Sequence, residues 1–328
     1  MRQLRLQFGE RDRCGEGPLE AAVMDACARR GVRAAASMRG VEGFGAKHRL
    51  RTDRLLSLSE DAPLVAVAVG EDEVVAALAG EVRAMAGAGL LVGGPAQASD
   101  RAERVKVSVW GPRSGPTAPH LGAVAALRRH GAAAASVLLG VDGVLDGTRR
   151  RARFLAANRG VPAVTVGVGR RAAIDAALAE LDGAAPLVTV EPVELFRLIG
   201  TEGLHGGAAV ERGSGMDRPK LGGGATRVTL VTSAVASRGA HPAYLEFIHR
   251  LRREGAAGAT AQRGVWGFRG DGGPRGDRVL ALRRDVPVIV EVVDAPERAA
   301  RWLELALEAG REGDLVYVEP VAEALALR

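Results

Sequence analysis

The chain has 328 residues, 47% of them hydrophobic and 26% charged, which is enough material for two or three globular domains with buried cores. Its formal net charge of +6 comes from basic residues scattered among 39 acidic ones, and aromatic residues make up only 3%. This pattern argues against a continuous polyanion track or a row of base-stacking platforms. No stretch approaches the ~20 consecutive apolar residues of a membrane span, and no signal peptide is expected, so the predicted location is the cytoplasm.

The first 96 residues predict alternating strands and helices. Leu4, Leu6 and Phe8 alternate with polar residues, as in a half-buried strand. A helix follows, because apolar residues recur at helical spacing from Leu19 onward and Gly31 stands where a helix ends. We expect a second strand at about 32–38, a third in the sequence LVAVAV, a second helix at about 75–85 and a last strand near residue 90. The predicted order is βαββαβ.

The predicted βαββαβ order occurs three times in the sequence. Gly31 and Gly40, Gly131 and Gly140, and Gly255 and Gly264 are pairs nine residues apart, and Pro63, Pro162 and Pro287 follow each second glycine by 22 or 23 residues. Glycines and prolines in the same order and at the same spacing over a whole copy indicate an internal repeat. We predict a first module at 1–96, a linker at 97–103, a second module at 104–199, a Gly-rich and disordered linker at 200–225 and a third module at 226–328. In the third module, Asp294 and Glu297 predict a capping box before the second helix.

The predicted fold class is α+β, with three ferredoxin-like modules, each a four-stranded antiparallel sheet with both helices on one face. The strands after the three prolines are apolar at almost every position, so both of their faces must be covered. Helices cover one face only. We therefore expect the three sheets to pack face to face around a pseudo-threefold axis within a monomeric chain, because separate domains would leave an apolar sheet face in water.

The sequences RGVEGFG, TDRLLSLSED and the strand after Pro63 in the first copy resemble the PII-like family catalogued as domain of unknown function 190. The third copy, with RGVWGFRG and VIVEVVD, is similar. The resemblance implies a trimer-like arrangement, here made by one chain, with effectors such as nucleotides held between modules and a loop that contacts a target. It also implies a signalling role and, as a candidate partner, an inner-membrane transporter such as a fluoride exporter. Arg51 and Arg275 stand where the family usually has histidine, so any role of that histidine is in doubt here.

The best candidate site is the basic Gly-rich segment of the first copy, with a similar segment in the third. Glycines let backbone N–H groups turn toward an anion, and arginines hold phosphate or carboxylate through paired hydrogen bonds. The alternative is a solvated loop whose glycines only permit positive φ. The candidate effector is an anionic small molecule such as an adenine nucleotide. The candidate residues are Arg39, Gly40, Gly43, Gly45, Lys47, Arg49 and Arg51 in the first copy and Arg263, Gly264, Gly267, Arg269 and Arg275 in the third.

The aromatic residues beside these glycines, Phe44, Trp266 and Phe268, are candidates for partner contact, with core packing as the alternative. The second copy has LGVDGVLDG in place of RGVEGFG, which predicts a structural spacer. No catalytic motif is present, so an enzyme is not expected. Two other functions stay open: a ligand-free structural adaptor, and RNA binding, which shares the βαββαβ order but usually needs aromatic residues that LVAVAV, AVTVGV and VIVEVV lack.

Overall fold

A computed structural model describes residues 1–45, 48–52, 61–113, 119–153, 156–181, 187–200, 224–235, 241–276 and 285–327. The βαββαβ order occurs three times. The first copy contains β1 (Arg2–Gly9), α1 (Leu19–Arg30), β4 (Ala34–Arg39), β7 (Pro63–Gly70), α2 (Asp72–Met85) and β8 (Gly89–Pro95). The second contains β9 (Arg104–Pro112), α3 (Pro119–Arg129), β10 (Ala134–Leu145), β12 (Pro162–Arg170), α4 (Arg171–Glu180) and β13 (Leu187–Pro192). The third contains β15 (Ala225–Ser233), α5 (Ala243–Arg253), β16 (Ala259–Arg263), β19 (Pro287–Asp294), α6 (Pro296–Ala309) and β20 (Leu315–Val321).

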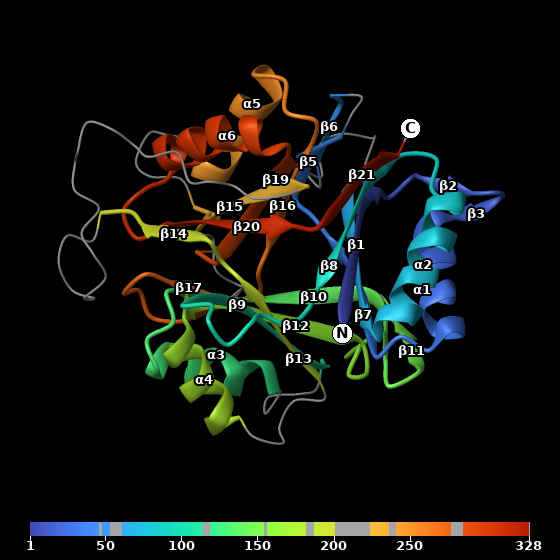
Figure 1. Ribbon diagram of the computed structural model, residues 1–328, viewed down its shortest axis with the longest axis horizontal. Coiled ribbons are helices and arrows are strands. Elements are labelled where there is room, and N and C mark those ends of the chain that lie inside the picture. The colour runs from blue at the N-terminus through green and yellow to red at the C-terminus, as the bar shows by residue number, and fades with distance from the viewer. Residues whose placement is uncertain are drawn as a thin grey trace.

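Each copy builds a four-stranded antiparallel sheet with one strand order. The sheets run β8-β1-β7-β4, β13-β9-β12-β10 and β20-β15-β19-β16, so the first and third strands of each copy are central. Figure 1 shows the three helix pairs at the periphery, with the sheets toward the middle. We call two positions of different copies equivalent when they occupy the same place in these strand registers.

A local sequence signal explains the end of one helix, and another predicted signal fails at the start of a different helix. Helix α1 ends at Gly31, which has φ of 68° and the left-handed conformation expected of it. The predicted capping box of α6 is wrong: the N-cap is Ala295, and it has no side-chain capping bond. The carboxylate of Asp294 instead accepts a hydrogen bond from the indole Nε1 of Trp302 at 3.0 Å. Burying that indole N–H needs an acceptor, and Asp294 supplies it.

The strands after the prolines divide their side chains between two cores. In β7, Leu64, Ala66 and Ala68 pack with the helices of their own copy, and the alternate valines pack into a core that all three copies share. The shared core takes residues from every sheet, among them Met38, Trp110, Leu138, Ile289 and Tyr317. The second covered face that the apolar strands require is therefore found between the copies.

Short strands connect the copies in cyclic order. Strand β5 (Glu42–Phe44) of the first copy pairs with β16 of the third, the second half of β10 pairs with β4 of the first, and β17 (Trp266–Arg269) pairs with β10 of the second. The register is the same each time, because Phe44, Val144 and Phe268 stand opposite Ala259, Ala35 and Ala135. In each copy, therefore, one strand pairs with the sheet of one neighbouring copy, and the sheet of the same copy pairs with a strand from the other neighbour.

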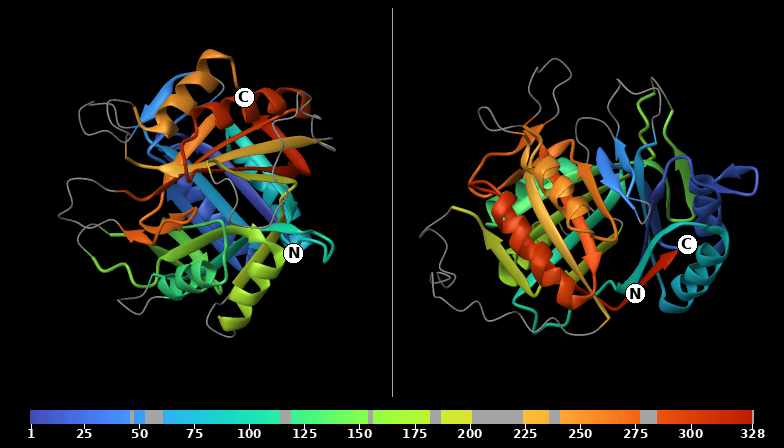
Figure 2. Two further views of the ribbon diagram at one scale, coloured as in Figure 1. Left: turned by 90° about the vertical axis from the view of Figure 1, so that its left-hand side faces the viewer. Right: turned by 90° about the horizontal axis from the view of Figure 1, so that it is seen from above.

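A second set of pairings joins the ends of the copies. Strand β14 (Leu195–Leu198) pairs with β20, β21 (Glu323–Leu327) pairs with β8, and a single bridge links Gln97 to Val190. In the right-hand view of Figure 2, the red C-terminal strand lies beside the strands of the first copy. The remaining short strands are β2 (Arg13–Cys14), β3 (Gly17–Pro18), β6 (Leu50–Thr52), β11 (Thr148–Arg151) and β18 (Arg275–Gly276).

The predicted linkers lie at 97–103 and 200–225 in the chain. Strand β9 begins at Arg104, directly after the short polar segment at 97–103. Of the segment 200–225, residues 201–223 lie outside the described residues, and so does the predicted disorder there. Within the described part of the chain, none of the helices has the length and apolar character needed to cross a membrane.

Candidate functional site

The glycines of the candidate segments lie at the junctions between copies. A Cβ atom on Gly43 would stand 2.7 Å from the carbonyl oxygen of Ala259, one on Gly143 would stand 2.3 Å from that of Ala35, and one on Gly267 would stand 2.1 Å from that of Ala135. The three glycines are equivalent, and each faces the backbone of the strand that its own strand pairs with. Close approach of two backbones requires glycine there.

The first glycine of each segment, Gly40, Gly140 or Gly264, lies against the carbonyl oxygen of the proline that opens the third strand. The backbone N–H groups of Gly40 and Gly264 donate to these oxygens, those of Pro63 and Pro287, at 2.7 and 2.8 Å. These two N–H groups are therefore committed to the fold and do not point toward a ligand. Binding of an effector by the remaining residues of the segments stays a prediction.

The aromatic candidates face inward. Phe44 is 4% exposed and packs in the core of the third copy, while Phe268 is 2% exposed and packs in that of the second. Val144 takes the equivalent place in the core of the first copy. The structure assigns Phe44 and Phe268 to contacts between copies, in place of the predicted contact with a partner, whereas Trp266 is half-buried.

The basic residues of the first segment are engaged by carboxylates. Arg39 donates to Glu10 at 2.9 Å, and the guanidinium of Arg51 lies 3.1 Å from a carboxylate oxygen of Asp61 and 3.6 Å from one of Asp12. Gly45 and Arg49 are exposed, and Lys47 lies outside the described residues. An anion that binds this segment must therefore compete with three acidic side chains.

The third segment lines a cavity of about 320 Å³. Arg269 and Arg275 line it together with Asp285, which is equivalent to Asp61 and forms an ion pair with Arg275. Arg269 donates to the buried Asp314 at 2.7 Å. Burial raises the pKa of Asp314, although Thr232 and the backbone N–H of Arg311 also donate to it. The cavity thus offers two guanidinium groups, both already in contact with carboxylates.

A neighbouring copy holds the loop that borders this cavity. Arg128 of α3 donates to the carbonyl oxygens of Gly270 and Asp271, and the backbone N–H of Gly270 donates to the carbonyl of Ala133 at 2.9 Å. The other candidate, Arg263, is half-buried in β16, and its Nε lacks a hydrogen-bond partner within the described residues. Of the predicted residues, the structure brings Gly267, Arg269 and Arg275 together around one cavity.

The middle copy differs in the way its sequence suggested. Asp142 is fully buried and forms an ion pair with Arg149, which also reaches Asp25 of the first copy. Gly160 stands where the other two copies have Asp61 and Asp285. Asp142 and Arg149 therefore stabilise the junction with the first copy. The role of the middle copy as a structural spacer stays a prediction.

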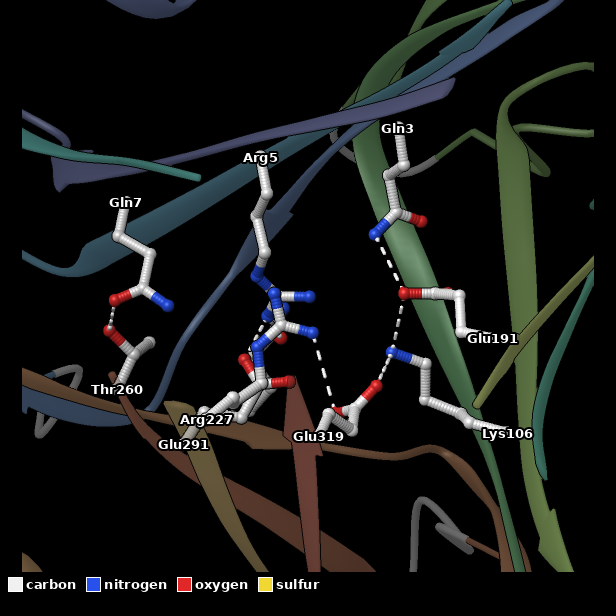
Figure 3. A network of polar contacts seen from close by, with 10 residues as sticks. Gln3, Arg5, Gln7, Lys106, Glu191, Arg227, Thr260, Glu291 and Glu319 are labelled. Carbon is white, nitrogen blue, oxygen red and sulfur yellow. Dashed lines mark hydrogen bonds and ion pairs between the residues drawn. The ribbon is translucent and has the colours of Figure 1, made fainter. Parts of the chain in front are cut away.

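A second polar region, which sequence reasoning missed, lies where the three sheets meet. Figure 3 shows its charged side chains, in which cations and carboxylates from the three copies point toward one another. Arg5 of the first copy pairs with Glu291 of the third, Lys106 of the second lies 3.0 Å from Glu191 and also bonds Glu319 of the third, and Arg227 lies 3.4 Å from Glu319. The described cluster contains three cations and three carboxylates: Arg5, Lys106, Arg227, Glu191, Glu291 and Glu319.

The charges of this cluster stabilise one another against burial. Burial would raise the pKa of Glu319, but Lys106 and Arg227 outweigh it and hold that pKa below its ordinary range. Burial also opposes the charge of Arg227, yet Glu319 and Glu291 raise its pKa, whereas for Arg5 burial prevails over Glu291 and lowers the pKa. Because a guanidinium stays charged in proteins, Arg5 and Arg227 keep their positive charges beside these carboxylates.

Beside the cluster is a chamber of about 30 Å³, close to the volume of one water molecule in the liquid. Arg5, Trp110 and Gln262 line it, one from each copy. Each has an N–H group, at Nε, Nε1 and Nε2 respectively, for which the described residues provide no acceptor. Water is the ordinary partner of such buried donors.

One signal could have located this region from the sequence. VTVEP and VYVEP place Glu191 and Glu319 one residue before the proline that closes a copy, and Lys106 and Arg227 stand at alternating positions of the first strands. A charge that alternates with valines on a central strand points toward the face that we assigned to the shared core. Within the described residues, His, Cys, Asp and Glu form no group of three or more that could hold a metal ion.

Comparison with known proteins identifies the family. The model of the family DUF190, described as "Uncharacterized ACR", matches residues 1–98, 119–195 and 225–322, one match per copy. The chain therefore belongs to this family and contains it three times. A UPF0166 protein of Aquifex aeolicus (strain VF5) is 30% identical over 92 residues, which are 28% of this chain and 86% of the relative. A single copy thus accounts for most of that relative.

Among solved structures, the chain is similar to an aspartate kinase from Synechocystis with a TM-score of 0.27 and 10% sequence identity. The similarity covers 97% of this chain and 52% of the kinase chain, so the chain spans about half of that protein's length.

Proposed function

We propose that the protein is a PII-like regulator in which one chain supplies three ferredoxin-like modules arranged as a pseudo-trimer. Three observations support this arrangement: the strand order common to the copies, their cyclic strand pairing and the shared core. The curated relative, which is little longer than one copy, supports it from the sequence side. The proposed activity is reversible binding of a small anionic effector and control of a partner, not catalysis.

The observation that carries the effector proposal is the cavity at the third segment. Its two guanidinium groups, Arg269 and Arg275, can hold a phosphate or carboxylate bidentately once Asp285 gives way. The exchange of one carboxylate for a ligand anion leaves the local charge pairing intact. Arg269 then keeps its bond to Asp314, so the ligand needs to displace only one acidic side chain.

The effector would act on the junction between the second and third copies. Arg128 donates hydrogen bonds to the loop that borders the cavity. Ligand contacts at Arg269 and Arg275 would therefore change the environment of this contact between the second and third modules. A partner that binds one loop conformation better than the other would be coupled to the ligand by that difference in affinity. We propose an adenine nucleotide as the effector and, from the family resemblance, a transporter of the inner membrane as the partner of a cytoplasmic regulator.

Isothermal titration of the purified chain with ATP, ADP, AMP and cyclic nucleotides tests this proposal. We expect binding to one of them, a loss of at least tenfold in affinity in the Arg269→Ala, Arg275→Ala variant, and tighter binding in Asp285→Asn, which removes the competing carboxylate. The matched control is Arg83→Ala, Arg252→Ala, which removes the same charge from two exposed helix positions. No heat at millimolar nucleotide, or equal affinity in the cavity variant and the control, contradicts the proposal.

A ligand-free adaptor is the second candidate, and one observation favours it. Arg39, Arg51, Arg269 and Arg275 all have carboxylate partners within the protein, as expected if the arginines only order the loops. The titration separates the two functions. RNA binding has less support, because Trp110 and Tyr317, the aromatic residues on the inner sheet faces, are each 1% exposed in the shared core.

A further inference from the structure

A cavity of about 300 Å³ lies where the last strands of the three copies converge. It is distinct from the cavity at the third segment and is lined by the three equivalent prolines that close the copies, Pro95, Pro192 and Pro320. Gln3, Glu191, Glu319 and Arg227 of the central polar region also line it, so one side of the cavity is charged. Val92, Val321 and Ala322 contribute apolar lining to the same cavity.

Beside this cavity, one copy lacks a charge pair that the other two have. Lys106 stands opposite Glu191 in the strand register of the second copy, and Arg227 stands opposite Glu319 in that of the third. The equivalent positions of the first copy are Gln3 and Gly94. Gly94 has no side chain to fill the space, yet a Cβ there would meet only Ala322 at an ordinary 3.7 Å. The fold therefore does not require glycine at this position.

The chemistry of the lining favours a positively charged ligand. Glu191 is 8% exposed, and its Oε2 accepts from Gln3 and Lys106, but its Oε1 has no hydrogen-bond partner within the described residues. A buried carboxylate oxygen without a donor is costly, so a ligand whose N–H reaches this oxygen after a small shift of the Glu191 side chain gains free energy. The charged residues of the lining are Glu191, Glu319 and Arg227, two negative and one positive.

We propose that this cavity binds a small organic ammonium ion, with its charged nitrogen at Glu191 and its apolar body against the prolines and valines. The volume suits a ligand of several carbon atoms, and an apolar body matches the apolar lining better than the water shell of a metal ion does. The ligand takes the place of the cationic side chain that the first copy lacks at Gln3. Because it touches all three copies, its binding stabilises the assembled arrangement over an opened one.

Titration calorimetry and thermal unfolding of the full chain with n-butylammonium chloride test the proposal. Sodium butyrate and butan-1-ol serve as ligands of the same length with the opposite charge and no charge. We expect n-butylammonium alone to bind and to raise Tm in a concentration-dependent way. Equal binding of butan-1-ol overturns the proposal. So does the absence of amine binding to the folded chain at about 10 millimolar, a concentration on the order of the weakest specific affinities.

Two variants locate the ligand. Glu191→Gln removes the acceptor and should weaken amine binding at least tenfold, whereas Glu323→Gln, an equal charge change outside the cavity lining, should leave it unchanged. If Glu191→Gln does not fold, Gly94→Leu decides, because its side chain occupies part of the cavity beside Ala322 and leaves every charge in place. Amine binding that survives Gly94→Leu overturns the proposal. Nucleotide binding at Arg269 and Arg275 is measured separately, so failure of either proposal leaves the other standing.

Discussion

The junctions between copies and the centre of the molecule solve the same packing problem in opposite ways. At the junctions one contact is repeated three times, with Gly43, Gly143 and Gly267 against the backbone of the next copy. At the centre the equivalent positions carry different chemistry, Gln3 with Gly94, Lys106 with Glu191 and Arg227 with Glu319. Backbone pairing tolerates little variation, whereas a buried charge cluster needs only overall balance. Within a single chain, the three centre positions can therefore diverge as long as their charges compensate.

The largest effect is expected at the junctions. In Gly143→Ala, the new methyl group would stand 2.3 Å from a backbone carbonyl that cannot move without breaking the pairing of β10 with β4. We expect a loss of more than about 4 kcal/mol of unfolding free energy, in the range reserved for severe core or backbone disruption. Gly80→Ala is the control, because Gly80 lies in α2 with open space around it, and alanine favours a helix by about 1 kcal/mol. Urea unfolding measures both, and equal stability of the two variants would show that the junction is not rigid.

A slightly smaller effect is expected at the centre, with a distinct signature. Arg5→Met leaves Glu291 buried without its cation and should cost about 3–5 kcal/mol, and Glu291→Met should cost a similar amount. The double variant removes both charges and should be more stable than either single variant, because apolar replacement of a buried pair is often close to neutral. A double-mutant cycle by chemical denaturation checks this. Additive losses would mean that the two charges do not compensate each other.

A third prediction compares copies at one position. Phe268→Val in the core of the second copy should cost about 1–3 kcal/mol, less than a full truncation to alanine, because valine already occupies the equivalent place at Val144. Val144→Phe should destabilise as well, since the core of the first copy has formed around the smaller side chain. Thermal unfolding of both variants tests this. If Val144→Phe raises Tm, the first junction is underpacked.

The smallest effect concerns pH. The pKa of Glu319 is lower in the folded chain than in the unfolded one, so Glu319 contributes stability at neutral pH that is lost as the pH falls below about 4.3 and through its folded pKa. One group of this kind gives a slope of at most about 1.4 kcal/mol per pH unit. Glu319→Gln, measured by denaturant unfolding between neutral and acid pH, should show a shallower acid loss than the unaltered chain. An unchanged slope would assign the acid sensitivity to other carboxylates.

The sequence predicted the parts of the fold that rest on local patterns. Apolar periodicity predicted α1, Gly31 predicted its end, and the continuous apolar character of β7 indicated a second covered face. Strands β5, β17 and β21 were not predicted, because they have five residues or fewer and their partners lie in other copies. The glycine spacing identified the segments that lie at the junctions between copies. Its physical cause, close backbone approach across a junction, depends on contacts between residues more than a hundred positions apart and is not visible in the spacing itself.

The cyclic strand pairing fixes the order in which the protein can become complete during synthesis. The first copy can assemble its own four strands early, but β5 pairs with β16 and β8 pairs with β21. Both partners leave the ribosome more than two hundred residues later. At ordinary translation rates of about 5–20 residues per second, the edges of the first copy stay open for roughly ten seconds or more. Exposed edges of that duration are the natural targets of chaperones and of wrong pairing between nascent chains.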